Sequence, residues 1–270
     1  MISLPHQSQK GKRAAGLLFH DVLHGSAVSG FQRRAAVPYK ITTTAFEGIL
    51  DAIAASPASP RRIFDCAFPP SSDCLFLTFD DGGSSACSVS QLLNDRGWSG
   101  HFLITTSRIG DPRFVSESDI RRLRDAGNIV GSHSHSHPDI FKALSPQEMR
   151  AEWQTSCGIL SEILGEPCLS ASVPGGDISR AVFDSARLEG IRYLFTSEPW
   201  LYPRRHGTCW VIGRTCIKAG TTAKHAGALA SFEGWRRALI KRRIKGVGKT
   251  VLAPFYKYYV RAKTRELQHG

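Results

Sequence analysis

Two adjacent aspartates, Asp80 and Asp81, directly follow the apolar run 75–79 and precede two glycines. Acidic side chains at the C-terminal end of a buried parallel strand lie where β/α barrels and open α/β sheets build their sites. Neighbouring like charges are costly unless a cation compensates them, and a bound metal ion would do so. For this segment alone, the alternative is an Asp–Gly turn preceded by a solvated aspartate.

Three histidines, His133, His135 and His137, occur within five residues and are flanked by serines. Imidazole is a common ligand of zinc and similar divalent metals. The four-residue separation of His133 and His137 suits two ligands of one metal ion in a turn or helical conformation. A polar loop that is merely rich in histidine is the alternative.

The two segments together resemble a known family. Residues 78–82 read T-F-D-D-G and residues 132–138 read S-H-S-H-S-H-P. They are similar to the first two motifs, T-F-D-D-G and S-H-[ST]-x-S-H-P, of the polysaccharide deacetylases (carbohydrate esterase family 4, or NodB homology domain). The resemblance extends over about 17–212 and implies a deformed (β/α) barrel. It also implies a metal-dependent hydrolase that removes an N-acetyl group from an amino sugar in a polysaccharide, oligosaccharide or lipid-linked saccharide.

The resemblance also implies roles for individual residues. Asp81, His133 and His137 would be the ligands of one divalent metal ion, with zinc expected and cobalt, nickel or manganese as alternatives. Asp80 would be the general base. His135 falls at a position that varies in the family, so we assign it to the pocket wall, with a ligand role as the alternative.

A general acid must protonate the departing amine, and in this family it is a histidine in a late L-x-H motif. Within the region of the resemblance, 17–212, no such motif follows Ile191. However, residues 18–22, L-F-H-D-V, resemble the Y-H-D-V opening of circularly permuted members. We therefore predict His20 as the acid, with a structural histidine near the barrel mouth as the alternative reading. His24 and His225 are weaker candidates for the same role.

The third family motif, R-x-P-[YFG]-G, departs from its pattern, because residues 172–176 read S-V-P-G-G. The family arginine, which pairs with the base, is replaced by Ser172. Arg180 or Arg192 could substitute for it in space. If neither does, the chain would be a glycan-binding or scaffold protein that retains only the metal site. The predicted substrate pocket comprises His135, Pro174, Gly175 and Trp200, with ordinary packing as the alternative for the tryptophan.

These residues need a scaffold of repeated β/α units. Short apolar runs without alternation predict buried parallel strands at 16–19, 74–79, 101–105, 128–131, 169–173, 191–195 and 210–212. Helical periodicity predicts helices over 44–55, 84–96, 117–126, 146–164 and 179–189. The helix over 146–164 has the clearest start, with Ser145 as N-cap, Pro146 in the first turn and Glu148 completing a capping box. The fold class is therefore α/β.

Composition excludes several classes of protein. The chain has 270 residues, of which 41% are hydrophobic and 21% charged, so it is neither disordered nor of low complexity. No stretch reaches the roughly 18 to 20 apolar residues of a spanning helix. Residues 1–16 lack the apolar core of a secretory signal, so we expect a cytoplasmic protein, with the inner face of the membrane as a further option.

The net charge of +12 is concentrated at the C-terminus. Residues 232–270 hold eleven Lys or Arg and two acidic residues, which is +9 of the total. We therefore divide the chain into a barrel, 1–230, and a basic amphipathic helical tail, 231–270. Trp235, Leu239 and Ile240 are expected to share one apolar face. Contact with an anionic membrane is the preferred use of this tail, nucleic-acid binding is less favoured, and a solvated helix packed on the barrel is the alternative.

Overall fold

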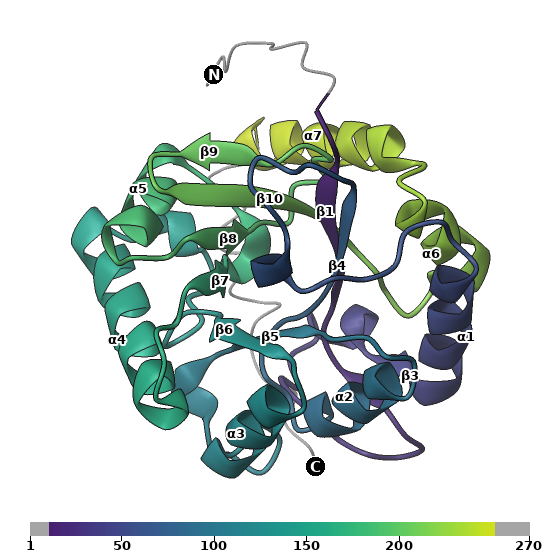
Figure 1. Ribbon diagram of the computed structural model, residues 1–270. Helices are drawn as coiled ribbons and strands as arrows, with labels where there is room; N and C mark the ends of the chain where they lie inside the picture. The colour runs from purple at the N-terminus through teal and green to yellow at the C-terminus, as the bar shows by residue number, and fades with distance from the viewer. Residues whose placement is uncertain (1–10, 252–270) are drawn as a thin grey trace.

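The computed structural model describes the backbone of residues 11–251 and the side chains of residues 11–244. Seven parallel strands form a closed barrel, because β1 pairs with β4 on one side and with β10 on the other (Figure 1). The barrel order is β1, β4, β5, β6, β7, β8, β10, and β9 adds to β10 in antiparallel orientation. The strands are β1 (Ala14–Phe19), β4 (Cys74–Phe79), β5 (His101–Ile104), β6 (Ile129–Ser132), β7 (Ser170–Ser172), β8 (Tyr193–Phe195), β9 (Arg204–His206) and β10 (Cys209–Cys216). The predicted (β/α) barrel is confirmed.

Helices surround the barrel (Figure 1). They are α1 (Thr43–Ala54), α2 (Ala86–Asn94), α3 (Glu117–Asp125), α4 (Pro146–Leu164), α5 (Arg180–Leu188), α6 (Ala223–Ala230) and α7 (Trp235–Val251). A two-stranded sheet of β2 (Val22–Leu23) and β3 (Ile41–Thr42) precedes α1. Short 3-10 helices occupy Val37–Tyr39, Ile63–Asp65, Thr106–Arg108, Phe141–Ala143 and Pro174–Gly176. The first five α-helices match the sequence prediction to within two residues at each end, whereas the sequence analysis did not identify α6.

Helix α4 shows how local sequence sets an element. The Ser145 hydroxyl accepts a hydrogen bond from the backbone amide of Glu148, whose carboxylate accepts one from the Ser145 amide. This reciprocal capping satisfies two amides of the first turn. The helix ends at Gly165, which has a φ of 68°, a conformation that glycine adopts without steric cost. Because Met149 and Trp153 are buried on its inner face, α4 is fixed against the barrel.

The N-terminal strand β1 completes the barrel beside the strand of the two aspartates. Leu18 and Phe19 of β1 pair with Thr78 and Phe79 of β4, and the Asp80 amide donates a hydrogen bond of 3.0 Å to the Phe19 carbonyl. The residues that follow the two strands therefore lie side by side at the carboxyl end of the barrel. This places His20 next to Asp80, although sixty positions separate them in sequence.

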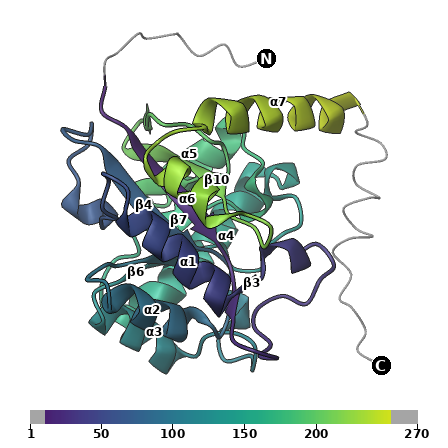
Figure 2. The same ribbon diagram turned by 90° about the vertical axis from the view of Figure 1, so that its right-hand side faces the viewer.

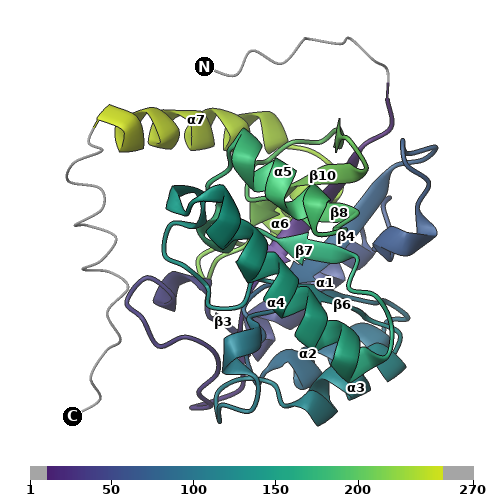
Figure 3. The same ribbon diagram turned by 90° about the vertical axis from the view of Figure 1, so that its left-hand side faces the viewer.

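Helix α7 packs on the barrel through its first turn (Figures 2 and 3). Trp235 is fully buried, and its indole N–H donates a 2.9 Å hydrogen bond to the Leu229 carbonyl. The expected shared apolar face is wrong in part, since Ile240 is 49% exposed and lies away from Trp235. Residues 252–270 of the predicted tail lie outside the described residues, and the division at 230/231 stays a prediction. No described helix is both long and apolar enough to cross a membrane.

Candidate metal and catalytic site

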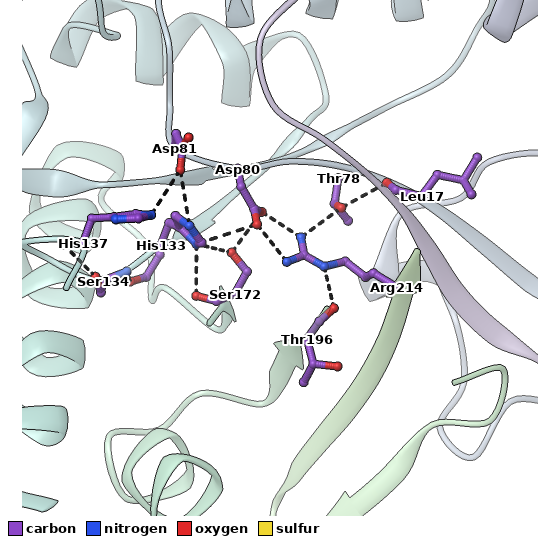
Figure 4. A network of polar contacts seen from close by, with 11 residues as sticks. Leu17, Thr78, Asp80, Asp81, His133, Ser134, His137, Ser172, Thr196 and Arg214 are labelled. Atoms are coloured by element: carbon purple, nitrogen blue, oxygen red, sulfur yellow. Dashed lines mark hydrogen bonds and ion pairs between the residues drawn. The ribbon is translucent and has the colours of Figure 1, made fainter. Parts of the chain in front are cut away.

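Asp81, His133 and His137 converge at the carboxyl ends of β4 and β6 (Figure 4). One ligand atom from each lies within 4.8 Å of the other two. The Asp81 Oδ1 atom is 3.4 Å from His133 Nε2 and 3.5 Å from His137 Nε2. His135 stands outside this group, because its Nδ1 is hydrogen-bonded to the Thr106 hydroxyl at 2.9 Å. The structure therefore brings together the three predicted ligands and leaves the alternative ligand at the rim.

Side chains from the barrel wall shape the histidine loop. Ser134 and His137 have positive φ angles of 65° and 54°, and the Ser134 hydroxyl accepts a hydrogen bond of 3.1 Å from the His137 amide. Glu152 of α4 accepts hydrogen bonds of 2.9 and 2.8 Å from the amides of residues 135 and 136. This carboxylate fixes the turn between His133 and His137, the two candidate ligands. The sequence analysis treated α4 as structural and missed Glu152.

The polar atoms of the three residues fit a divalent metal ion. Among the described residues, the Asp81 Oδ1 atom, which faces Nε2 of both histidines, is buried without a hydrogen-bond partner. Burial, together with the charges of Asp80 and Asp21, raises the pKa of Asp81 well above its usual range. A cation between the ligands would relieve this cost. One carboxylate and two imidazoles are a donor set typical of zinc and related metals.

The imidazoles are also in the form that metal binding requires. Burial lowers the pKa of both His133 and His137, so both rings are neutral at pH 7. The His133 Nδ1 atom lies 2.6 Å from the Ser172 hydroxyl. That hydroxyl donates a 3.0 Å hydrogen bond to Asp80, so it accepts from His133 Nδ1–H. This leaves His133 Nε2 with its lone pair directed at Asp81 and the metal position.

Asp80 is held by a buried arginine that the sequence analysis missed. Arg214 of β10 donates hydrogen bonds of 2.7 and 2.8 Å to the two carboxylate oxygens of Asp80 (Figure 4). The guanidinium is itself fixed by the Thr78 hydroxyl at 3.0 Å and the Thr196 carbonyl at 2.9 Å. Burial would raise the pKa of Asp80, but Arg214 and His133 outweigh it and hold the pKa below its usual range. Asp80 is therefore an oriented, ionised carboxylate.

The suggested substitutes for the family arginine are wrong. Arg180 is 83% exposed and lies 3.7 Å from Asp184, while Arg192 is exposed at the start of β8. The cation is instead Arg214 of β10, which is the second strand after β7 in the barrel order. Gly16 of β1, which pairs with Arg214, leaves room for it, because a Cβ at this position would lie 3.1 Å from Arg214 Cγ. An arginine within an otherwise buried apolar strand was the sequence signal for such a buried ion pair.

His20 directly follows β1 and shares a small cavity with Asp80, lined also by Gly82 and Phe102. Its ring packs against that of Tyr39 at a centroid distance of 4.6 Å, with the two planes tilted by 43°. Burial lowers the pKa of His20 to about 4, although the charge of Asp80 opposes this shift. The other proposed acids are elsewhere: His24 is exposed, and His225 lies on α6 beside the start of α7.

The remaining predicted pocket residues lie around the rim. Pro174 is buried and Gly175 is exposed, and Gly175 has a φ of 65°, so the turn of the third motif is retained. A Cβ on Gly175 would lie 3.2 Å from the Asp139 carbonyl, which places this turn beside the histidine loop. The Trp200 ring is stacked under the Arg204 guanidinium at 3.6 Å, a contact that favours the packing alternative.

Comparisons with known proteins agree with the fold and the motifs. Residues 68–194 match the family model described as polysaccharide deacetylase. In Bacillus subtilis, YxkH, which carries the name of a polysaccharide deacetylase, is 22% identical over 160 residues, covering 59% of this chain and 57% of YxkH. The peptidoglycan-N-acetylmuramic acid deacetylase PdaC of the same organism is 29% identical over 133 residues, covering 48% of this chain and 27% of PdaC. The chain thus spans little more than half of the length of YxkH and about a quarter of the length of PdaC.

A solved polysaccharide deacetylase from Bacillus cereus superposes with a TM-score of 0.68 at 16% identity, covering 82% of this chain and 69% of that one. The family match begins after β1, so the strand that carries His20 lies outside it. Residues 68–194 therefore match the polysaccharide deacetylase family, and they lie within a NodB-like (β/α) barrel.

Proposed function

We propose that this protein is a metal-dependent hydrolase that removes the acetyl group from an N-acetylated amino sugar in a glycan. The observation that carries the proposal is the buried Asp80–Arg214 pair beside the Asp81, His133 and His137 cluster. An ionised carboxylate fixed next to three convergent metal-ligating atoms is what hydrolysis of an unreactive amide requires. Zinc is the proposed metal and a bacterial surface glycan the proposed substrate source.

Each side chain has a defined task in this proposal. A divalent ion bound by the three ligands would supply Lewis acidity toward water and the acetamide carbonyl. Asp80 accepts the proton that the attacking water loses, and Arg214 keeps both carboxylate oxygens oriented. His20, on the neighbouring strand end, donates a proton to the departing amine. Because burial lowers the pKa of His20 to about 4, its ring is neutral at pH 7, so the proton that it passes to the amine is the one that the attacking water has lost to Asp80.

The alternative of a glycan-binding protein without turnover rested on the missing family arginine. Arg214 supplies the same bidentate cation to Asp80 from another strand, so this structure gives that alternative no support.

The test is acetate release from a panel of N-acetylhexosamine oligomers by the purified protein with added zinc, cobalt or nickel. We expect turnover in wild type, loss of both metal binding and turnover in His133→Ala, and retained metal binding without turnover in Asp80→Asn. A matched control is His206→Ala, since this histidine lies on β9 and is paired with Asp184. Absence of acetate release from every substrate, with metal bound in calorimetry, would overturn the proposal.

A further inference from the structure

The exposed face of α7 carries cations and apolar side chains together. The helix contains seven Lys or Arg residues and neither Asp nor Glu. Two isoleucines one turn apart, Ile240 and Ile244, are 49% and 69% exposed. The exposed cations around them are Arg236, Arg237, Lys241 and Arg243. We call these six residues the α7 face.

The barrel fixes the orientation of this face. Trp235 is buried at the start of α7. Two turns later, Arg242 donates hydrogen bonds to the Glu198 carboxylate at 2.8 Å and to the Gly176 carbonyl at 2.6 Å. These anchors lie on the inner side of the helix, so the isoleucines and the remaining cations are held outward. The exposure of Ile240 and Ile244 is therefore imposed by contacts on the other side.

The positive charge continues onto the neighbouring sheet edge. Arg204 of β9 is exposed, and the pKa of its guanidinium is lowered by desolvation and by the charge of Arg243. Glu198, the nearest carboxylate to this pair, is already engaged by Arg242 at 2.8 Å. Arginines crowded in this way repel one another, and an anion at the surface would relieve the repulsion.

We propose that the α7 face docks the protein on an anionic lipid bilayer. Cations flanking exposed isoleucines match the two parts of such a surface, since lysine and arginine contact lipid phosphates and isoleucine enters the headgroup boundary. A nucleic acid would satisfy the cations but give no role to exposed aliphatic side chains, because single strands are bound through aromatic stacking. The described part of the α7 face contains no aromatic side chain.

Docking would bring the catalytic end of the barrel close to the bilayer. Arg242 contacts Gly176 and Asp177, in the loop after β7, and Ser172 at the end of β7 contacts both His133 and Asp80. An enzyme held in this way would meet lipid-linked or membrane-proximal saccharides. This last step rests on the proposed function, whereas bilayer binding does not.

The experiment is sedimentation of the full chain with vesicles of phosphatidylcholine alone or with about 30% phosphatidylglycerol. We expect binding only to the anionic vesicles, and weaker binding as salt rises. Arg236→Glu/Arg237→Glu should weaken binding by about tenfold or more. Ile240→Asn/Ile244→Asn, which keeps the charge, should weaken it by at least about fivefold. The matched control, Arg192→Glu/Lys224→Glu, reverses two exposed cations elsewhere and should bind as wild type.

Thermal melts establish that each variant is folded. Equal weakening by both charge-reversal pairs would overturn the proposal, because binding would then follow net charge alone. Indifference to the isoleucine substitutions, with tighter binding to a single-stranded oligonucleotide than to vesicles, would assign the face to nucleic acid instead. Neither result bears on acetate release from soluble oligomers, so failure here is distinguishable from failure of the proposed activity.

Discussion

Removing the guanidinium of Arg214 should expose its part in both stability and catalysis. The side chain is fully buried and donates two hydrogen bonds to Asp80, at 2.7 and 2.8 Å. Arg214→Gln leaves a buried carboxylate without its counter-ion, a change that costs about 3–5 kcal/mol in free energy of unfolding. Arg214→Lys keeps the charge but loses the bidentate geometry, so its loss should be smaller.

The same substitution should change the pH dependence of turnover. Arg214 holds the pKa of Asp80 below its usual range, so its removal raises that pKa. The acid limb of kcat/KM, which reports the deprotonation of the base, should then move to higher pH. At neutral pH we expect kcat/KM to fall by about 100-fold, because the base is less ionised and less well oriented.

The assays are denaturant unfolding and acetate release between about pH 4 and pH 9. Both are carried out on Arg214→Gln, Asp80→Asn and the double variant. The double variant should lose less stability than the sum of the losses in the two single variants, since each single substitution leaves the remaining partner buried and unpaired. Arg180→Gln is the control, because this arginine is 83% exposed. An unchanged acid limb together with additive losses of stability would refute the reasoning.

Two further predictions concern residues outside the reacting group. Glu152→Gln should weaken zinc binding by about tenfold in calorimetry, because Glu152 accepts hydrogen bonds of 2.9 and 2.8 Å from two amides of the histidine loop. The control is Glu162→Gln, since Glu162 is exposed on the same helix, and it should have no effect. Equal zinc affinities of wild type and Glu152→Gln would contradict this role. His101 donates to the Leu77 carbonyl and accepts from the Ile63 amide, both at 2.9 Å, and burial lowers its pKa from 6.5 to about 4. Its contribution to stability should be complete above pH 6.5 and decline as pH falls toward 4, by at most about 3 kcal/mol. Denaturant unfolding should show a smaller loss on acidification in His101→Gln than in wild type, and equal losses would contradict the prediction.

Local sequence determined much of the scaffold. The bounds of α4 follow from Ser145, Pro146 and Gly165, which act within one turn of each helix end. The strand over Cys74–Phe79 follows from a run that is apolar apart from Thr78, a pattern typical of a strand covered on both faces. Strand ends and short spacing pointed to the two aspartates and the three histidines, and the family resemblance singled out Asp81, His133 and His137, which the structure brings together.

Pairing across the barrel could not be read in the same way. Arg214 lies 134 positions from Asp80, and no local pattern in the sequence indicates which carboxylate a buried arginine will pair with. Glu152 reaches the histidine loop only because α4 packs beside β6. The exposure of Ile240 also depends on Trp235 and Arg242, which rotate α7 so that its apolar stripe is divided between barrel and solvent.

The sequence by itself therefore determined the strand and helix pattern, the candidate metal-ligating motifs and the concentration of charge near the C-terminus. Those properties depend on contacts within a few residues or on composition. Only the tertiary structure decided which arginine holds Asp80, which carboxylate fixes the histidine loop and which side of α7 faces outward. Closure of the barrel joins β1 to both β4 and β10, and this long-range pairing is what places His20, Asp80 and Arg214 around one site.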